Sequence, residues 1–234
     1  MSAIDDLLTA IFDSKKPLLY GEFAGWVRDS RRFKAFATTY QSKIRTKLKQ
    51  ARDEAGQKDL RAELEAAALL LREDRFVLEY ETYVAARQRG PDFTVTFKTH
   101  TPFNVEVRRV RSVELADDAE TRTGKLMAVL CDKVGQMPPS VINLLWLTSD
   151  GGLAEDDLAR AAATLRQLAE RKVEDFFTRR GFENAAEFLR QYQKLSGIVL
   201  RAPAGITVWL NPLAKHKPPA DLVAAVRRLD GENG

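Results

Sequence analysis

Two carboxylates and an arginine occupy positions from which they can act on one ion or phosphate group. Asp92 precedes the first of two short runs in which apolar and polar residues alternate, and Glu106 and Arg108 belong to the second. Such alternation is typical of half-buried strands, and the turn-forming residues between the runs predict a β-hairpin. Because phenylalanines and valines then share one face of the hairpin, Asp92, Glu106 and Arg108 share the other.

The same alternation predicts how the two strands pair. If Phe97 lies opposite Phe103, the connecting loop spans 98–102 and Asp92 lies across from Arg108. A slip by one residue would bury the charges and expose the aromatic rings, so the register is strongly specified. An ordinary amphipathic hairpin with an exposed ion pair is the alternative, because such pairs between strands are common.

A polar face of this kind suits a divalent metal ion, which prefers hard oxygen ligands and keeps positions for water and a phosphate. Asp92 and Glu106 are the candidate ligands. An arginine at position 108 can hold a phosphate or neutralise developing charge, but it stays protonated and cannot act as a base. If the preceding strand flanks the hairpin, Glu79 or Glu81 lies near Asp92 as well.

The remaining composition leaves few other kinds of chemistry. Cys131 is the only cysteine, which excludes an intrachain disulfide and a thiolate metal cluster. His100 and His216 fall in predicted loops far apart in the sequence, so zinc sites and histidine-based triads have little support. The glycine patterns of phosphate-binding loops and dinucleotide folds are absent. Any catalysis therefore depends on carboxylates.

The length and composition are those of a globular protein. The 234 residues can bury a sizeable core, and 44% of them are hydrophobic while 30% are charged. No apolar run approaches the roughly 20 residues that span a bilayer. The first ten residues carry acidic side chains where a signal peptide has basic ones. We therefore expect a cytoplasmic protein with no membrane partner.

The segment 26–52 is strongly basic. Nine lysines and arginines are opposed only by Asp29, so the rest of the chain carries a net charge of −4 against the total of +4. Apolar residues recur at helical spacing, which predicts a helix with an apolar seam and cationic flanks. The flanks either track a phosphate backbone or form a solvated face. The candidate nucleic-acid contacts are Lys43, Arg45, Lys47, Lys49 and Arg52.

The central part of the chain predicts an ordered series of elements. A helix from Asp59 to about Arg72 is followed by a strand over 75–85, the hairpin, a helix over 119–134 and an apolar strand over 140–149. The continuous apolar run of the last strand is typical of a sheet covered on both faces. The helices and strands predicted beyond residue 150 either extend this sheet or cover it.

The dipeptide Pro-Asp at 91–92, followed by Glu-Val-Arg at 106–108, resembles the active-site signature of the PD-(D/E)XK nuclease superfamily. The order helix, strand, strand, strand, helix, strand over 59–149 is that of its αβββαβ core. The resemblance implies a restriction-endonuclease-like α/β fold with a mixed sheet. It divides the chain into an N-terminal basic helical extension (1–55), the core (56–150) and a C-terminal elaboration of helices and strands (151–234).

The resemblance also implies an activity, the metal-dependent hydrolysis of phosphodiester bonds in nucleic acid by an endonuclease, on DNA in preference to RNA. Asp92 and Glu106 would bind Mg²⁺ or Mn²⁺. The family takes a further glutamate from the first helix of the core, for which Glu63 is the first candidate and Glu65 the second. Helical periodicity alone would leave both glutamates on the surface.

The family has a lysine where this chain has Arg108. Because of this difference from the family motif, functions other than catalysis remain as alternatives. Lys133 and Gln136 follow at downstream positions that the family places beside the phosphate, although periodicity alone exposes both. One alternative is a catalytically silent protein of the same fold that binds nucleic acid or a protein partner. Another is a structural scaffold whose basic helix meets an acidic protein. A homodimer is compatible with each function.

Overall fold

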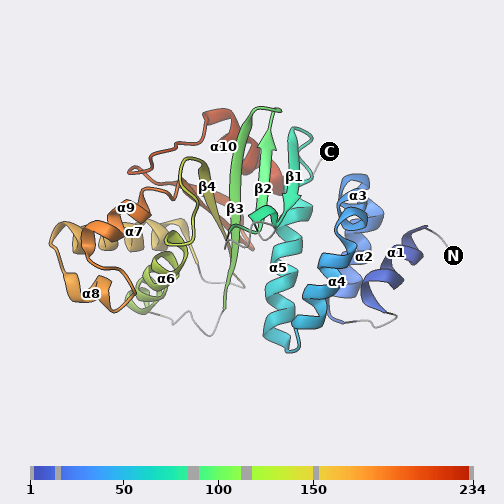
Figure 1. Cartoon of the computed structure of the whole chain (residues 1–234), viewed down its shortest axis with the longest axis horizontal. Helices are drawn as coiled ribbons and strands as arrows, with labels where there is room; N and C mark the ends of the chain where they lie inside the picture. Colours follow the sequence, from blue (N-terminus) through green and yellow to red (C-terminus); the bar gives the residue numbers. More distant parts are fainter. Residues whose placement is uncertain (1–2, 14–16, 84–89, 112–117, 150–152, 232–234) are drawn as a thin grey trace.

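The computed structural model describes residues 3–13, 17–83, 90–111, 118–149 and 153–231. Within them, six strands form one mixed sheet whose spatial order follows the chain, so the α/β class is as expected (Figure 1). The strands are β1 (Phe76–Tyr80), β2 (Phe93–Phe97), β3 (Thr101–Val110), β4 (Ile142–Ser149), β5 (Gly197–Ala202) and β6 (Gly205–Leu210). β3, β4 and β5 run parallel, and the other neighbouring pairs are antiparallel.

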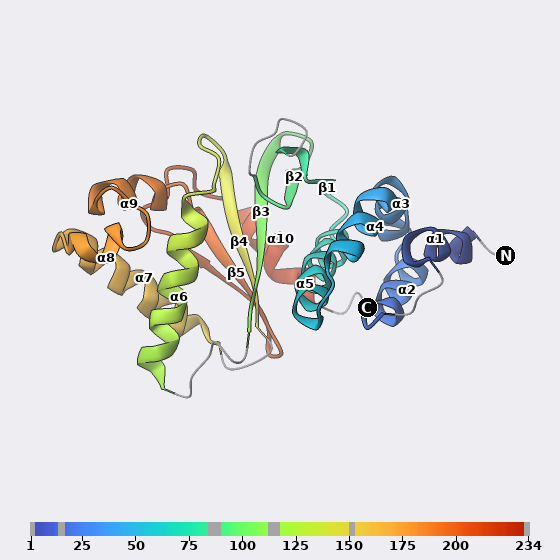
Figure 2. The same cartoon turned by 60° about the horizontal axis from the view of Figure 1, so that its bottom comes forward.

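Helices pack on both sides of the sheet, each side with its own apolar core (Figures 1 and 2). The first core includes α1 (Ala3–Phe12), α2 (Leu19–Asp29), α3 (Arg31–Thr39), α4 (Gln41–Gln50), α5 (Glu54–Leu70) and α10 (Ala220–Arg227), which a short 3-10 turn follows. The second includes α6 (Ala119–Val134), α7 (Glu155–Glu170), α8 (Glu174–Thr178) and α9 (Ala185–Tyr192). No helix in the described part of the chain combines the length and apolar character needed to cross a bilayer.

Two elements of the central region, β4 and α6, form as predicted. Leu144 and Trp146 of β4 belong to the core beneath α5, whereas Leu145 and Leu147 belong to the core beneath α6. Successive side chains of a strand point to opposite faces, so a strand buried on both faces reads as one apolar run. α6 spans the expected range, and the Asp118 side chain caps its first turn. The order α5, β1, β2, β3, α6, β4 is the predicted order.

The hairpin of β2 and β3 forms, but the predicted register is wrong by two residues. Phe97 pairs with Thr101 instead of the expected Phe103. The loop is therefore shorter than predicted, and Lys98 and Thr99 within it adopt left-handed conformations with φ of 51° and 68°. Two left-handed residues tighten the turn and close the hairpin earlier than its composition indicates.

The shift in register leaves the predicted faces of the hairpin unchanged. Side chains alternate with a period of two, so a shift by two residues returns each one to the same side. The phenylalanines and valines of β2 and the adjacent half of β3 are buried in the first core, as expected. The shift does change which residue lies opposite Asp92. Continued by one residue, the observed register places Asp92 opposite Glu106 instead of Arg108.

The prediction of a single helix over the basic segment 26–52 is wrong. The segment spans the end of α2 and all of α3 and α4. Ser30 and Tyr40 leave helical geometry and separate the three helices. The Ser30 hydroxyl accepts a hydrogen bond of 3.0 Å from the Phe33 N–H and so caps α3. The apolar seam is nonetheless packed against the first core, which these helices share with the sheet.

α5 begins at Glu54, earlier than the predicted start at Asp59. The Asp53 side chain accepts a hydrogen bond of 2.8 Å from the Gly56 N–H, which caps an earlier turn and places the glycine inside the helix. Asp59 is therefore not a cap. Its carboxylate is available to Arg109 of β3, whose Nε lies 2.8 Å from Asp59 Oδ1.

β1 ends at Tyr80, short of the predicted end at residue 85. Glu81 has a left-handed φ of 50°, which turns the chain out of the sheet. The Lys43 ammonium donates hydrogen bonds to the carbonyls of Tyr80 and Glu81, at 2.9 Å and 3.4 Å, where the strand ends. Residues 84–85, the last of the predicted strand, lie outside the described residues.

Candidate active site

The candidate site lies where β3 continues beyond β2. The pairing of β2 with β3 stops at Phe93 and Val105, while β3 stays paired with β4 as far as Val110. α5 lies on one side of the sheet here and α6 on the other (Figures 1 and 2). A pocket of about 380 Å³ opens between them. It brings together the four predicted catalytic residues, Glu63, Asp92, Glu106 and Arg108, and with them Lys47 and Lys133.

Hydrogen bonds to the main chain hold Asp92 just before β2. Its Oδ2 accepts a hydrogen bond of 2.8 Å from the Val107 N–H, on the part of β3 that continues past β2. Its carbonyl accepts another of 2.8 Å from the Glu81 N–H. Burial, and after it the negative charge of Glu106, raise the pKa of the Asp92 carboxyl to about 7. The two predicted metal ligands therefore interact across the hairpin.

Glu106 is paired with a lysine of α6. The Nζ of Lys133, in the last turn of that helix, lies 2.8 Å from Glu106 Oε1, and both side chains are mostly buried. Arg108 lines the same pocket, because it follows Glu106 by two residues along β3. Gln136 lies in an adjoining hollow, and its amide donates a hydrogen bond to the Asp132 carbonyl.

Glu63 reaches the pocket from α5, and Lys47 reaches it from α4. The Lys47 Nζ lies 2.5 Å from Glu63 Oε1. Burial raises the pKa of the Glu63 carboxyl to about 7, and the charge of Asp92 adds to the rise, while Lys47 and the Tyr80 hydroxyl oppose it. Glu65, the second candidate on this helix, pairs with two arginines that are not in the pocket.

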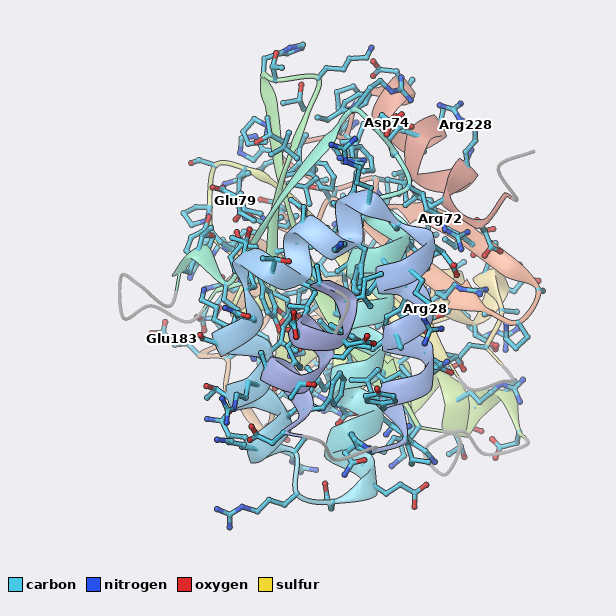
Figure 3. All side chains as sticks on the ribbon, turned by 90° about the vertical axis from the view of Figure 1, so that its right-hand side faces the viewer. Arg28, Arg72, Asp74, Glu79, Glu183 and Arg228 are labelled. Atoms are coloured by element: carbon cyan, nitrogen blue, oxygen red, sulfur yellow. The ribbon has the colours of Figure 1, made fainter. Side chains whose placement is uncertain are left out.

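Of the two glutamates considered on the preceding strand, Glu81 joins the cluster. Its Oε1 lies 2.8 Å from the Lys47 Nζ, so Lys47 bridges Glu63 and Glu81. Glu79 stays on the exposed side of β1, opposite Thr94 (Figure 3). The two side chains differ because the left-handed conformation of Glu81 takes this residue out of the strand, whereas Glu79 remains within it.

The other basic residues of the predicted phosphate-tracking surface lie outside the pocket. Lys43 is bound to the carbonyls at the end of β1. Arg45 and Lys49 both approach Asp13, at 2.5 Å and 3.9 Å. Arg52 is exposed beside them. Of the five candidate contacts in this segment, Lys47 alone lines the pocket.

An ion pair between a buried arginine and a partly exposed aspartate ties β3 to α5 in the wall of the pocket. The Arg109 side chain is 6% exposed and holds Asp59 Oδ1, while Arg111 lies 3.2 Å from Asp59 Oδ2. Loss of Asp59 would remove this counter-charge from the buried Arg109 guanidinium, so the pair resists separation. It fixes this part of α5 against β3 and thereby holds Glu63, one turn further along, at the pocket.

Sequence reasoning missed that Lys47 belongs with the carboxylates. The usable signal was its place three residues after Ile44, at the edge of the apolar seam, where a side chain is half-buried by the core. A lysine in such a place keeps its stem on apolar surface and directs its ammonium toward an acceptor. Which acceptor it meets depends on how α4 packs beside β1, and this does not follow from local sequence.

The charges in and beside the pocket are closely balanced. Besides the Asp59–Arg109 pair, four carboxylates meet three cationic side chains. The carboxylates are those of Glu63, Glu81, Asp92 and Glu106, and the cations are Lys47, Arg108 and Lys133. Within the described residues, no three Asp, Glu, His or Cys side chains are arranged as a metal site. Burial, and after it the charge of a neighbouring carboxylate, raise the pKa values of Glu63 and Asp92 although the lysines oppose the rise.

We expect Asp92→Asn to raise the free energy of unfolding in the absence of metal. The pKa of this carboxyl is about 7 in the folded protein against an ordinary value of 3.8, so ionisation opposes folding above pH 7 and ceases to do so as the pH falls to 4. The variant amide oxygen still accepts the Val107 hydrogen bond. The gain should be about 1 to 2 kcal/mol at pH 8 and close to zero at pH 4.

Urea unfolding in EDTA at the two pH values measures this gain, with the exposed Glu79→Gln as the control. A variant that is less stable than the parent at pH 8, or a gain that does not depend on pH, would contradict the account of a disfavoured carboxylate.

Comparisons with protein-family models, with curated proteins and with solved structures give no match.

Proposed function

We propose that the chain is a metal-dependent nuclease with a restriction-endonuclease-like core, which hydrolyses phosphodiester bonds in nucleic acid. One observation carries the proposal: Asp92, just before β2, and Glu106 of β3 line one pocket together with cationic side chains from α4, α6 and β3. The element order around the pocket is that of the αβββαβ core, which supports the proposal independently of the motif.

Asp92 and Glu106 are the residues that would hold Mg²⁺ or Mn²⁺. Their oxygens are hard ligands. Burial, and after it the charge of Glu106, raise the pKa of Asp92, so a cation between the two carboxylates would relieve the repulsion between them. The Val107 N–H orients the Asp92 carboxylate before any ion binds. Glu63 would assist directly or through water. A bound metal ion lowers the pKa of its water and stabilises negative charge on phosphate oxygens.

The cationic side chains have separate tasks. Arg108 is a permanent cation and would hold the phosphate oxygens. Lys133 places an ammonium 2.8 Å from Glu106, so the pocket contains a lysine although position 108 does not. An ammonium is compact and can move between the carboxylate and a phosphate, whereas the arginine at 108 presents a planar, fixed charge.

A catalytically silent protein of the same fold that binds nucleic acid or a protein partner is the second candidate. One observation favours it: Lys47 and Lys133 already form ion pairs with three of the four carboxylates. A structural ion-pair network has this property. Cleavage that requires metal separates the two candidates, because the silent protein would bind nucleic acid and leave it intact.

The test is cleavage of labelled single-stranded and duplex DNA and RNA by the purified protein. We expect cleavage of at least one substrate in Mg²⁺ or Mn²⁺ and none in EDTA, with DNA the first choice. Binding of nucleic acid without cleavage in either metal would favour the silent protein. Cleavage that persists in EDTA would show that the pocket is not a metal-dependent centre.

Arg108→Lys is the informative change where the chain departs from the family motif. Lysine restores a compact ammonium whose pKa can shift, so the variant should cleave at least as fast as the parent, by up to about tenfold. Initial rates in Mg²⁺ measure this, with Arg108→Gln to show the effect of losing the charge. A lysine variant as slow as the glutamine variant would show that the planar guanidinium itself is required.

A further inference from the structure

Lys47 is a cation placed among carboxylates that a second metal ion would need. Its Nζ lies 2.5 Å from Glu63 Oε1 and 2.8 Å from Glu81 Oε1, and its side chain is only 22% exposed. A divalent ion requires several oxygen ligands, commonly carboxylates from more than one residue. The carboxylates that could bind an ion beside the Asp92–Glu106 pair are thus already bound to an ammonium.

The ammonium is held firmly in this place. α4 is anchored by the fully buried Ile44, and the Lys47 Nζ lies 4.9 Å from the centre of the Tyr80 ring. Burial alone would lower the pKa of Lys47, but the charges of Glu63 and Asp92 outweigh it and raise the pKa to about 12. The side chain therefore stays charged at neutral pH, when a metal ion would compete with it.

Glu81 is also held for this contact. Its left-handed φ of 50° is unfavourable for a residue with a Cβ and persists where surrounding contacts enforce it. Lys43, one turn before Lys47 on α4, binds the Glu81 carbonyl, and the Glu81 N–H donates to the Asp92 carbonyl. Two lysines of one helix thus hold the main chain and the side chain of the same glutamate.

We propose that Lys47 is a built-in cation that takes the place of a second divalent metal ion, so that the pocket is a one-metal site on Asp92 and Glu106. The proposal rests on the proposed function. In two-metal sites the ions lie about 3.5 to 4 Å apart and clamp the two sides of the phosphate. Lys47 supplies one of these positive charges permanently, through α4, a helix that precedes the αβββαβ core.

The experiment counts bound Mn²⁺ by electron paramagnetic resonance, from the loss of the free-ion signal, for four proteins. We expect one Mn²⁺ per chain in the parent and two in Lys47→Met, which keeps the stem over Tyr80 but frees Glu63 and Glu81. Lys47→Arg restores the charge and should bind one. Lys49→Met, which removes an exposed lysine of the same helix, should also bind one.

Every outcome bears on the proposal. Two ions in the parent, or one in both the parent and a folded Lys47→Met, would overturn the inference and leave the proposed function standing. No ion in the parent and one in Lys47→Met would overturn the one-metal site and count against metal-dependent cleavage, although Lys47 would then still exclude an ion. No ion in either would contradict both. Circular dichroism checks the fold, and if Lys47→Met does not fold, the count in the parent decides.

Discussion

Replacement of Asp92 or Glu106 by the corresponding amide is expected to reduce the rate of nucleic-acid cleavage by about 10³-fold or more. An amide keeps the size of the side chain but is a weaker ligand for a hard cation. Asp92→Asn retains an oxygen for the Val107 N–H, so its loss of activity should not reflect a lost structural contact. Initial rates on labelled DNA in excess Mg²⁺ measure the effect.

Glu79→Gln is the matched control for these variants, because Glu79 is an exposed glutamate of β1 that precedes Glu81 by two residues. It should cleave at the rate of the parent. If Asp92→Asn and Glu106→Gln both retain the activity of the control, the catalytic centre lies elsewhere in the molecule.

Lys133→Met is expected to reduce the rate by about 10²-fold. The change removes the ammonium that lies 2.8 Å from Glu106. The cations that remain in the pocket are arginines, which cannot exchange a proton near neutral pH, and Lys47, which is bound to Glu63. The loss should fall on kcat more than on KM, because the lysine lies beside a proposed metal ligand. Steady-state kinetics on one substrate separate the two parameters.

Lys125→Met removes an exposed lysine two turns earlier on α6 and is the control for the position of the charge. Lys133→Arg tests the requirement for a compact ammonium and should restore only part of the rate. If the kcat of Lys133→Met equals that of the parent, Lys133 has no role in catalysis and only forms a structural ion pair with Glu106.

The parts of the fold that follow a simple period were predictable from the sequence. The two faces of the hairpin follow from strict alternation, and they place Asp92, Glu106 and Arg108 on the polar side in the predicted register and in the observed one, which differ by two residues. The burial of β4 on both faces follows from its continuous apolar run. Glu63 was selected by resemblance, and the structure places it in the pocket.

The errors arose where geometry depends on contacts that local sequence does not reveal. Lys98 and Thr99 of the hairpin turn adopt left-handed conformations. Glycine or asparagine would have indicated such a conformation in the sequence, but lysine and threonine do not. The strand before the hairpin ends early because Glu81 is also left-handed. Lys47 reached the carboxylates through the packing of α4 beside β1, and a charge count over 26–52 could not separate it from its exposed neighbours.

The most direct test of the central claim is whether Asp92 and Glu106 together bind a divalent metal ion, because this measurement requires no knowledge of the substrate. Mn²⁺ binding is compared by isothermal titration calorimetry for the parent and for the double variant Asp92→Asn/Glu106→Gln. We predict a saturable Mn²⁺ site in the parent that the double variant lacks. Equal affinity and stoichiometry in the two proteins would contradict the assignment of this pair as the metal ligands.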